Sequence, residues 1–260
     1  MLPRHSTRFR VVLAGAVMTI VRIIAVATAA LIAAQAHAAD ITGTPKILDG
    51  DTVQFGSQRV RLGAMASPET DQQCLNEKGE PWACGIAARE ALKAFAGDKP
   101  WTCRPVGATQ HGSVLGRCTA GGEDVEKWMV RNGWGLASAR EAKGYGADEA
   151  EARANKVGLW AGAFVSPREW RHRNANAMAL GAFKVTPTTK PLLLRSAHGA
   201  NPPSPDCAIK ANVNRSGVCI YHQPGGRFYA KIKMDNPEKG NRWYCSVSEA
   251  KASNCRETRR

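Results

Sequence analysis

Two acidic residues around a glycine mark the first stretch of the sequence that could do chemistry. Asp49 and Asp51 flank Gly50, and a turn of this kind offers the hard oxygen ligands that calcium prefers. Further along, Glu69 in the run Ser-Pro-Glu-Thr is of a type that can act as a general base. Ala66 stands just before it, where we expect another carboxylate. The stretch is therefore either a working active site or the remains of one.

Basic residues outnumber acidic ones in the chain. Its 260 residues carry a formal net charge of +14. Residues 1–38 contain four arginines and no acidic residue, so residues 39–260 keep a charge of +10. This sign favours polyanionic partners such as nucleic acid or an anionic polysaccharide. A basic surface without a specific partner is the alternative.

The first 38 residues have the pattern of an export signal. A basic start precedes an apolar run at 23–34, and Ala36-His37-Ala38 is a small-x-small cleavage site. Translation from Met18 would make Arg22 the positive end of a compact signal. We expect an exported protein, periplasmic or secreted, with a signal peptide at 1–38. A retained anchor is the alternative, and no later segment is apolar enough to span a bilayer.

All eight cysteines follow the expected signal, four before residue 120 and four after residue 200. Even numbers in an exported chain favour disulfides. Zinc is the rival interpretation, but no Cys-x-x-Cys pair occurs. Cys74 and Cys84 flank a polar loop, so we predict that they pair. Cys103 and Cys118 fall on consecutive strands of an expected hairpin, so a bridge between them is predicted too.

Hydrophobic periodicity predicts one α+β domain between residues 39 and 173. Strand-like stretches separated by glycine-containing turns are expected at 42–48, 52–55, 58–64, 100–104 and 114–120. Helices with the 3.6-residue period are expected at 85–96, 124–132 and 148–157, each followed by a glycine. Five short strands and three helices are typical of a domain of ordinary size.

The composition changes after this domain. Residues 174–205 lose the periodicity and are rich in proline and threonine, so we expect a mostly flexible linker. Docking of Leu192-Leu193-Leu194 on a domain is the alternative. Residues 206–260 form a second unit, small for an unaided core, which crosslinks would stabilise. Ser246 and Glu249 have capping-box spacing there, which predicts a helix through 250–253.

A series of motifs follows in order along the chain: Asp-Gly-Asp-Thr at 49–52, Arg-Leu at 61–62, Ser-Pro-Glu-Thr at 67–70, Gly-Gly-Glu-Asp at 121–124, Trp-Met-Val-Arg at 128–131, Gly133 and Gly-Leu-Trp at 158–160. In this order and spacing they resemble the thermonuclease family of staphylococcal nuclease-like domains. The resemblance covers residues 41–173. It implies a five-stranded OB-fold barrel with packed helices, a fold often used to bind oligonucleotides. It also implies calcium-dependent hydrolysis of phosphodiesters in DNA or RNA.

The resemblance further implies a calcium ion held by two aspartates and a threonine carbonyl. Asp51 matches the first metal aspartate, and Asp49 matches the turn aspartate beside it. Ser67 takes the threonine position, which is harmless if only its carbonyl is used. Ala66 takes the position of the second metal aspartate and offers no ligand. Asp71 is a candidate for a weak replacement, and an ordinary loop aspartate is the alternative.

In the same family two arginines hold the phosphate, and a glutamate activates or orients the attacking water. Arg61 matches the first arginine and Glu69 the catalytic glutamate. Arg59 is an additional basic group for substrate binding on the strand face of Arg61. Ser113 falls where the second arginine belongs. Arg117 shares the strand face of Ser113 but would lie about 13 Å further along, too far for a simple replacement.

The tail contains Cys-Ala-Ile-Lys at 207–210, Ile-Tyr-His at 220–222, Pro-Gly-Gly at 224–226, Phe-Tyr at 228–229 and Arg-Trp-Tyr-Cys at 242–245. With these residues it resembles a small module at the C-termini of exported nuclease-like proteins. Such modules usually hold one cysteine pair, which corresponds to Cys207 and Cys245, and we expect Cys219 and Cys255 to bridge each other. Aromatic residues alternate with basic ones in this tail, which suits base stacking and phosphate contact, whereas building a core is the alternative. His222 is a lone histidine without accompanying metal ligands, and it is interpreted as structural.

Two functional hypotheses follow. The first is an exported calcium-dependent phosphodiesterase with low or altered activity that uses Asp51, Arg61 and Glu69. The second is a non-catalytic binder of nucleic acid or another polyanion. The retained residues fit either hypothesis, because Asp49 and Asp51 can also stabilise their own turn and Arg61 can also pair with Glu69.

Overall fold

The computed structural model describes residues 38–109, 112–138, 142–172, 174–197, 199–234 and 240–258. Residues 39–260 form one compact unit. The expected signal peptide lies outside the described residues apart from Ala38, so it stays a prediction. Among the described residues, no helix has both the length and the apolar character needed to cross a membrane.

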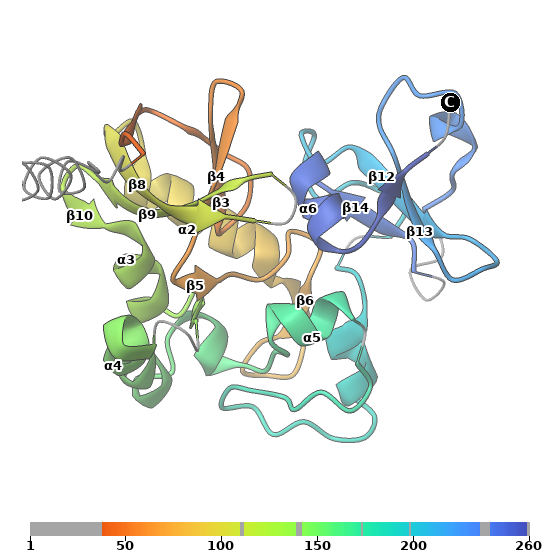
Figure 1. Cartoon of the computed structure of the whole chain (residues 1–260). Helices are drawn as coiled ribbons and strands as arrows, with labels where there is room; N and C mark the ends of the chain where they lie inside the picture. The colour runs from red at the N-terminus through yellow and green to blue at the C-terminus, as the bar shows by residue number, and fades with distance from the viewer. Residues whose placement is uncertain are drawn as a thin grey trace, which may run out of the picture. The chain divides into compact units, whose positions relative to one another are not determined.

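A mixed sheet curls into a half-barrel in the first part of the chain (Figure 1). Its strands follow the order β1 (Ile41–Gly43), β8 (Trp101–Ala108), β9 (Val114–Ala120), β4 (Gln58–Leu62), β3 (Thr52–Phe55) and β2 (Lys46–Ile47), and β10 (Glu123–Asp124) pairs with β9. Strands β4 and β9 pair in parallel, and the other neighbours are antiparallel. This confirms the expected OB-type α+β fold.

The expected first strand at 42–48 is divided in two. Pro45 lies between β1 and β2 and has no N–H to donate to a ladder. β1 consequently pairs with β8, whereas β2 pairs with β3. The fourth strand is longer than expected, because β8 follows β9 as far as Ala108 after a bulge beside Pro105.

Three helices pack on the half-barrel. They are α2 (Cys84–Ala96), α3 (Val125–Arg131) and α4 (Ala142–Ala154). The Asp124 side chain caps α3 by accepting from the N–H of Lys127 at 2.9 Å. α4 begins six residues before the expected start at 148. Gly144 and Gly146 lie in its first turns, and their low helix propensity hides this start in the sequence.

One continuous apolar core fills the space between sheet and helices. Its fully buried members include Val53, Val60, Leu62, Ala88, Leu92, Trp101, Val125 and Met129. Alternate strand residues supply one side of this core, and the apolar faces of α2 and α3 supply the other. The same alternation turns Arg59 and Arg61 away from the core, whose members on β4 are Val60 and Leu62.

The segment expected to be mostly flexible is packed against earlier parts of the chain. It follows η2 (Gly158–Ala161) and an unexpected short helix, α5 (Pro167–Arg171), and it contains η3 (Lys190–Leu194). Leu193 is fully buried with Leu75 and Trp170. Gln73 also donates its side-chain N–H to the carbonyl of Leu192 at 2.8 Å. The docking alternative therefore describes this segment, because its leucines cover β6 (Gln73–Leu75), which pairs with β7 (Pro81–Ala83).

A second sheet forms the C-terminal module, residues 206–258. It has the order β14 (Arg242–Tyr244), β12 (Ile209–Val213), β13 (Cys219–His222) and β15 (Arg256–Glu257), and η4 (Tyr229–Lys231) follows β13 in the chain. Helix α6 (Val247–Ala252) begins at Ser246, whose hydroxyl accepts from the N–H of Glu249 at 3.1 Å. This is half of the expected capping box. Figure 1 shows α6 on the side of the module that faces β3 and β4.

All eight cysteines are paired as expected. The bridges are Cys74–Cys84, Cys103–Cys118, Cys207–Cys245 and Cys219–Cys255. The second bridge joins directly opposed residues of β8 and β9. The last two lie within the C-terminal module. Whether that module is an independent domain beginning at residue 206 stays a prediction.

Candidate active site

The turn and strand residues singled out in the sequence meet at one small cavity. The turn between β2 and β3 places Asp49 and Asp51 there, and β4 places Arg61 opposite Thr52. The loop after β5 (Met65–Ala66) adds Ser67 and Glu69. The cavity volume is about 30 Å³. This is room for one or two water molecules and not for a phosphodiester.

Asp51 is held by three donors and has little free capacity. One carboxylate oxygen, Oδ2, accepts from the Arg61 guanidinium at 2.9 Å and from the Ser67 N–H at 3.1 Å. The other, Oδ1, accepts from the Thr52 hydroxyl at 3.0 Å. The negative charge of Asp51 raises the pKa of Arg61 further above its usual value.

Asp49 closes the turn rather than facing Arg61. Its Oδ1 accepts from the Asp51 N–H at 2.9 Å, as expected for a short turn. Burial raises the pKa of Asp49 well above its usual value, and the charge of Asp51 raises it further. Asp49 therefore has a local structural role in this turn.

Glu69, the expected catalytic residue, is buried and already paired. An arginine of α5, Arg171, donates from Nη1 to its Oε1. The Glu69 side chain is 7% exposed. Arg171 lies 102 residues further along the chain, outside every motif noted in the sequence, so nothing in the sequence identified it. Glu69 thus pairs with Arg171, whereas Arg61 pairs with Asp51 rather than with Glu69 as considered from the sequence.

The residues present do not fit a calcium ion. Ala66 lies in β5, paired with Leu136 of β11 (Leu136–Ala137), and contributes only a methyl group. Both oxygens of Asp51 have protein donors. No three His, Cys, Asp or Glu residues converge as a metal site anywhere in the described part of the chain. Calcium needs at least six oxygen ligands, and this cavity does not gather them.

Of three remaining candidates, one lines the cavity and two do not. Ser113 lines it, with a hydroxyl in place of the expected guanidinium. Arg117 donates to the Tyr145 hydroxyl at 3.0 Å in a separate groove on the outer face of β8 and β9. Arg59 is half-buried on β4 and does not line the cavity.

The weak replacement considered for the missing metal aspartate is wrong. Asp71 is fully buried and pairs with Arg242 of the C-terminal module, with 3.4 Å between Oδ2 and Nε. The hydroxyl of Ser196 donates to the same carboxylate oxygen. Asp71 therefore anchors two later segments and cannot turn towards Asp51 without leaving Arg242 buried and unpaired.

Helix α6 of the C-terminal module supplies a wall of the cavity that sequence reasoning missed. Ser248, Glu249 and Ala252 line it together with Glu69. Oε1 of Glu249 accepts from the N–H and the hydroxyl of Thr70 at 3.0 and 2.6 Å. Its Oε2 accepts from the Cys245 N–H at 2.9 Å. The S-x-x-E spacing identified Glu249 as a cap, but its contact with a residue 179 positions away has no local signal.

Most aromatic residues of the tail build its core. Tyr221, Trp243 and Tyr244 are buried. The Tyr229 hydroxyl donates a hydrogen bond to the Ala208 carbonyl at 2.7 Å. Phe228 is half-buried and lies beside two basic side chains. The stacking surface expected from the sequence is therefore small.

Two comparisons with known proteins bear on this site. The family model described as staphylococcal nuclease homologue matches residues 59–162. The succinoglycan biosynthesis protein ExoI of Rhizobium meliloti (strain 1021) is 34% identical over 140 residues, which are 52% of this chain and 73% of that protein. The chain belongs to the staphylococcal nuclease family. The family match includes Arg61 and Glu69 but ends before α5 and α6. Arg171 and Glu249 thus come from segments outside the matched domain.

Proposed function

We propose that this chain is an exported member of the staphylococcal nuclease family that binds nucleic acid, or another polyanion, and hydrolyses phosphodiesters only slowly. One observation carries the proposal. The cavity keeps Arg61 and Glu69, but Ala66 and Ser113 leave it without a second metal carboxylate and a second guanidinium. Four disulfides support export, since such bridges persist in oxidising compartments.

The size of the catalytic defect can be estimated from the two missing groups. Losing one transition-state donor costs about 3–4 kcal/mol, and an arginine that contacts the transferring phosphoryl group is worth about 10³–10⁵ in rate. A site lacking a metal carboxylate and an arginine should therefore hydrolyse phosphodiesters at least about 10⁴-fold more slowly. Only this lower bound is given, because the two losses are not additive and cannot simply be multiplied.

Binding of a polyanion requires fewer of the site's charged groups than hydrolysis of a phosphodiester does. The charge of +10 on residues 39–260 attracts a phosphate backbone without any metal ion. Such binding weakens steeply with salt, because each neutralised phosphate releases counterions. The relative is named for succinoglycan biosynthesis, so succinoglycan is included here among the polyanions to be compared.

Calcium-dependent hydrolysis is the second candidate. The presence of Asp51, Arg61 and Glu69 around one cavity favours it. In this case Asp51 and the Ser67 carbonyl would contribute to the metal, Arg61 would bind the phosphate, and Glu69 would act on the water. The fit of the described residues to calcium is poor, which is why this candidate ranks second.

One assay on the protein comprising residues 39–260 separates the candidates. Single-stranded DNA is titrated at several salt concentrations, and cleavage is followed with calcium or with chelator. The proposal expects salt-sensitive binding and cleavage at most about 10⁻⁴ of that of a complete site. Glu69→Gln is compared with Glu77→Gln, which changes an exposed glutamate that does not line the cavity. Fast cleavage that chelator and Glu69→Gln both abolish, while Glu77→Gln does not, would establish the second candidate instead.

A further inference from the structure

We propose that the C-terminal module is a built-in lid on the cavity, with α6 as its closing element and Glu249 as its latch on Thr70. The proposal rests on the proposed function in one respect, namely that this cavity is where the polyanion binds. It adds that the chain blocks its own site and that the module must move away before a phosphodiester can enter.

The latch joins the lid to the loop that carries Glu69. Thr70 directly follows Glu69, and its N–H and hydroxyl both donate to one oxygen of Glu249. The other oxygen holds the Cys245 N–H, so the carboxyl group is fully engaged. Glu249 is only 4% exposed. Removing it would leave the buried Thr70 N–H without its acceptor, which is costly.

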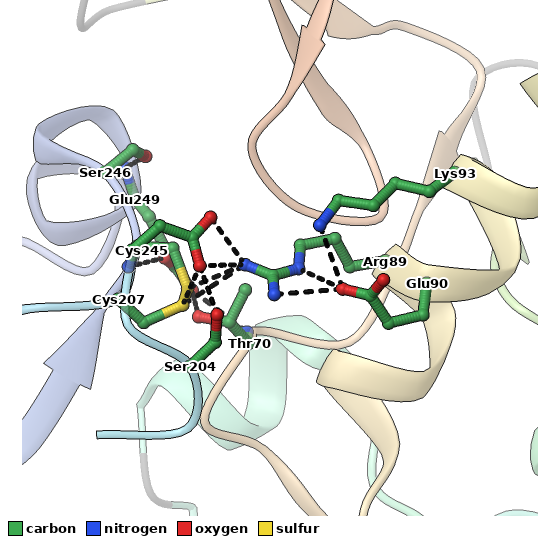
Figure 2. The surroundings of a disulfide bond; sticks show 10 residues. Thr70, Arg89, Glu90, Lys93, Ser204, Cys207, Cys245, Ser246 and Glu249 are labelled. Atoms are coloured by element: carbon green, nitrogen blue, oxygen red, sulfur yellow. Dashed lines mark hydrogen bonds and ion pairs between the residues drawn. A yellow bond between two sulfur atoms is a disulfide. The ribbon is translucent and has the colours of Figure 1, made fainter. Parts of the chain in front are cut away.

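Two further contacts hold the module around this latch. The Arg242 guanidinium of β14 pairs with Asp71, one residue beyond Thr70. On the other side, Arg89 of α2 reaches the module beside the Cys207–Cys245 bridge (Figure 2). Its Nη1 donates to both carboxylate oxygens of Asp206 at 3.2 Å and to the sulfur of Cys207 at 3.3 Å.

The closed arrangement explains the size of the cavity. Ser248, Glu249 and Ala252 make up one wall, and without them the groups around Arg61 would be open on that side. The volume of about 30 Å³ belongs to this closed form. A ligand that binds only the open form has an apparent affinity reduced by the fraction of molecules that are open. The contact between Glu249 and Thr70 therefore sets the apparent affinity of the cavity for a polyanion.

The first test compares Glu249→Ala with Lys251→Ala, an exposed change in the same helix. The Ser246 cap stays in both variants. Hydrogen exchange is measured in peptides covering residues 66–72 and 243–254, and binding is measured with a fluorescent oligothymidylate. We expect Glu249→Ala to raise exchange in both peptides and to tighten oligothymidylate binding about ten- to hundredfold, while Lys251→Ala does neither. Unchanged exchange and unchanged affinity in Glu249→Ala would overturn the lid.

A second test uses the unaltered chain and does not depend on a variant that folds. Saturating oligothymidylate should slow exchange in residues 60–69 and speed it in residues 245–252, because the occupied cavity displaces α6. Slower exchange in both regions would overturn the proposal, since the module would then be part of the bound site. If Glu249→Ala speeds exchange but no form binds oligothymidylate, the lid stands and the proposed binding function fails.

Discussion

At the scale of single residues, each charge that the cavity has kept is matched by another side chain. Asp51 pairs with Arg61, and Glu69 pairs with Arg171. A buried ion pair stabilises little against an apolar alternative, but losing one partner leaves a costly lone charge. The retained residues therefore have a structural reason to persist besides any catalytic one.

The missing groups give the first prediction at this scale. We expect Ala66→Asp with Ser113→Arg to raise the hydrolysis of single-stranded DNA in calcium by at least about 100-fold over Glu249→Ala alone, because each change restores a charge that the transition state requires. The change is made together with Glu249→Ala so that the cavity is open. Initial rates and calorimetric calcium titrations are the measurements.

The matched control for this prediction is Ala66→Asn with Ser113→Gln in the same background. It adds similar volume without charge, so it should neither bind calcium nor accelerate cleavage. Equal rates for the charged and uncharged pairs would show that Ala66 and Ser113 do not occupy the positions assigned to them.

At the scale of elements, the β8–β9 hairpin connects the site to the core. Its far strand begins just after Ser113, and its middle carries the Cys103–Cys118 bridge between opposed residues. The pair next along the ladder, Thr102 and Thr119, has no crosslink. The bridge therefore restricts the unfolded chain at the hairpin that sets the position of Ser113.

Removing this bridge should lower the free energy of unfolding. It closes a loop with a sequence separation of 15, for which chain entropy predicts about 3 kcal/mol. We expect Cys103→Ala with Cys118→Ala to show this loss in urea unfolding at neutral pH. Thr102→Ala with Thr119→Ala, the matched pair on the same ladder, should cost about 1 kcal/mol or less. Equal losses in the two double variants would indicate that the bridge adds nothing beyond strand pairing.

At the scale of the whole molecule, later segments of the chain converge on the loop at 67–72. Arg171 reaches Glu69, Ser196 and Arg242 reach Asp71, and Glu249 reaches Thr70. The result is a buried junction with several carboxyl groups. Burial raises the pKa of Glu249 to about 8, and the nearby charge of Glu69 contributes to the rise.

This junction makes stability depend on pH. Glu249 keeps its proton in the folded chain up to about pH 8, whereas it releases it near 4.5 when unfolded. The folded state thus binds more protons across this window. The contribution of Glu249 to stability is therefore full below pH 4.5 and is lost as the pH rises through 8. Asp49 acts in the same direction, as does Glu126, whose pKa burial raises to about 7.

We therefore expect the urea concentration at the unfolding midpoint to decrease as the pH rises from 5 to 9. Glu249→Gln should flatten this dependence in part, since Glu126 and Asp49 still contribute to it. Glu77→Gln, which changes an exposed carboxylate, should leave the slope unaltered. A midpoint that rises over this range would contradict the assignment of protonated carboxyl groups at the junction.

Local patterns predicted much of this protein. Residue patterns predicted the strands β3, β4 and β9 and the helices α2 and α3, and the resemblance to the thermonuclease family implied that they form a barrel. Even cysteine numbers, with the positions of Cys74, Cys84, Cys103 and Cys118, indicated disulfides. Gly144 and Gly146 concealed the start of α4, and Pro45 divided a strand that looked continuous, because one residue can override a pattern that its neighbours support.

The sequence by itself determined the family, the barrel elements and the identity of the missing charges at Ala66 and Ser113, since these depend on residue type and short spacing. Only the tertiary structure decided which side chains contact the charged residues that the site has kept. Arg171 contacts Glu69 from 102 residues away and Glu249 contacts Thr70 from 179 residues away, and such contacts leave no periodic trace in a chain. They form because buried carboxyl groups must find donors, and the nearest donors in space belong to segments far along the sequence.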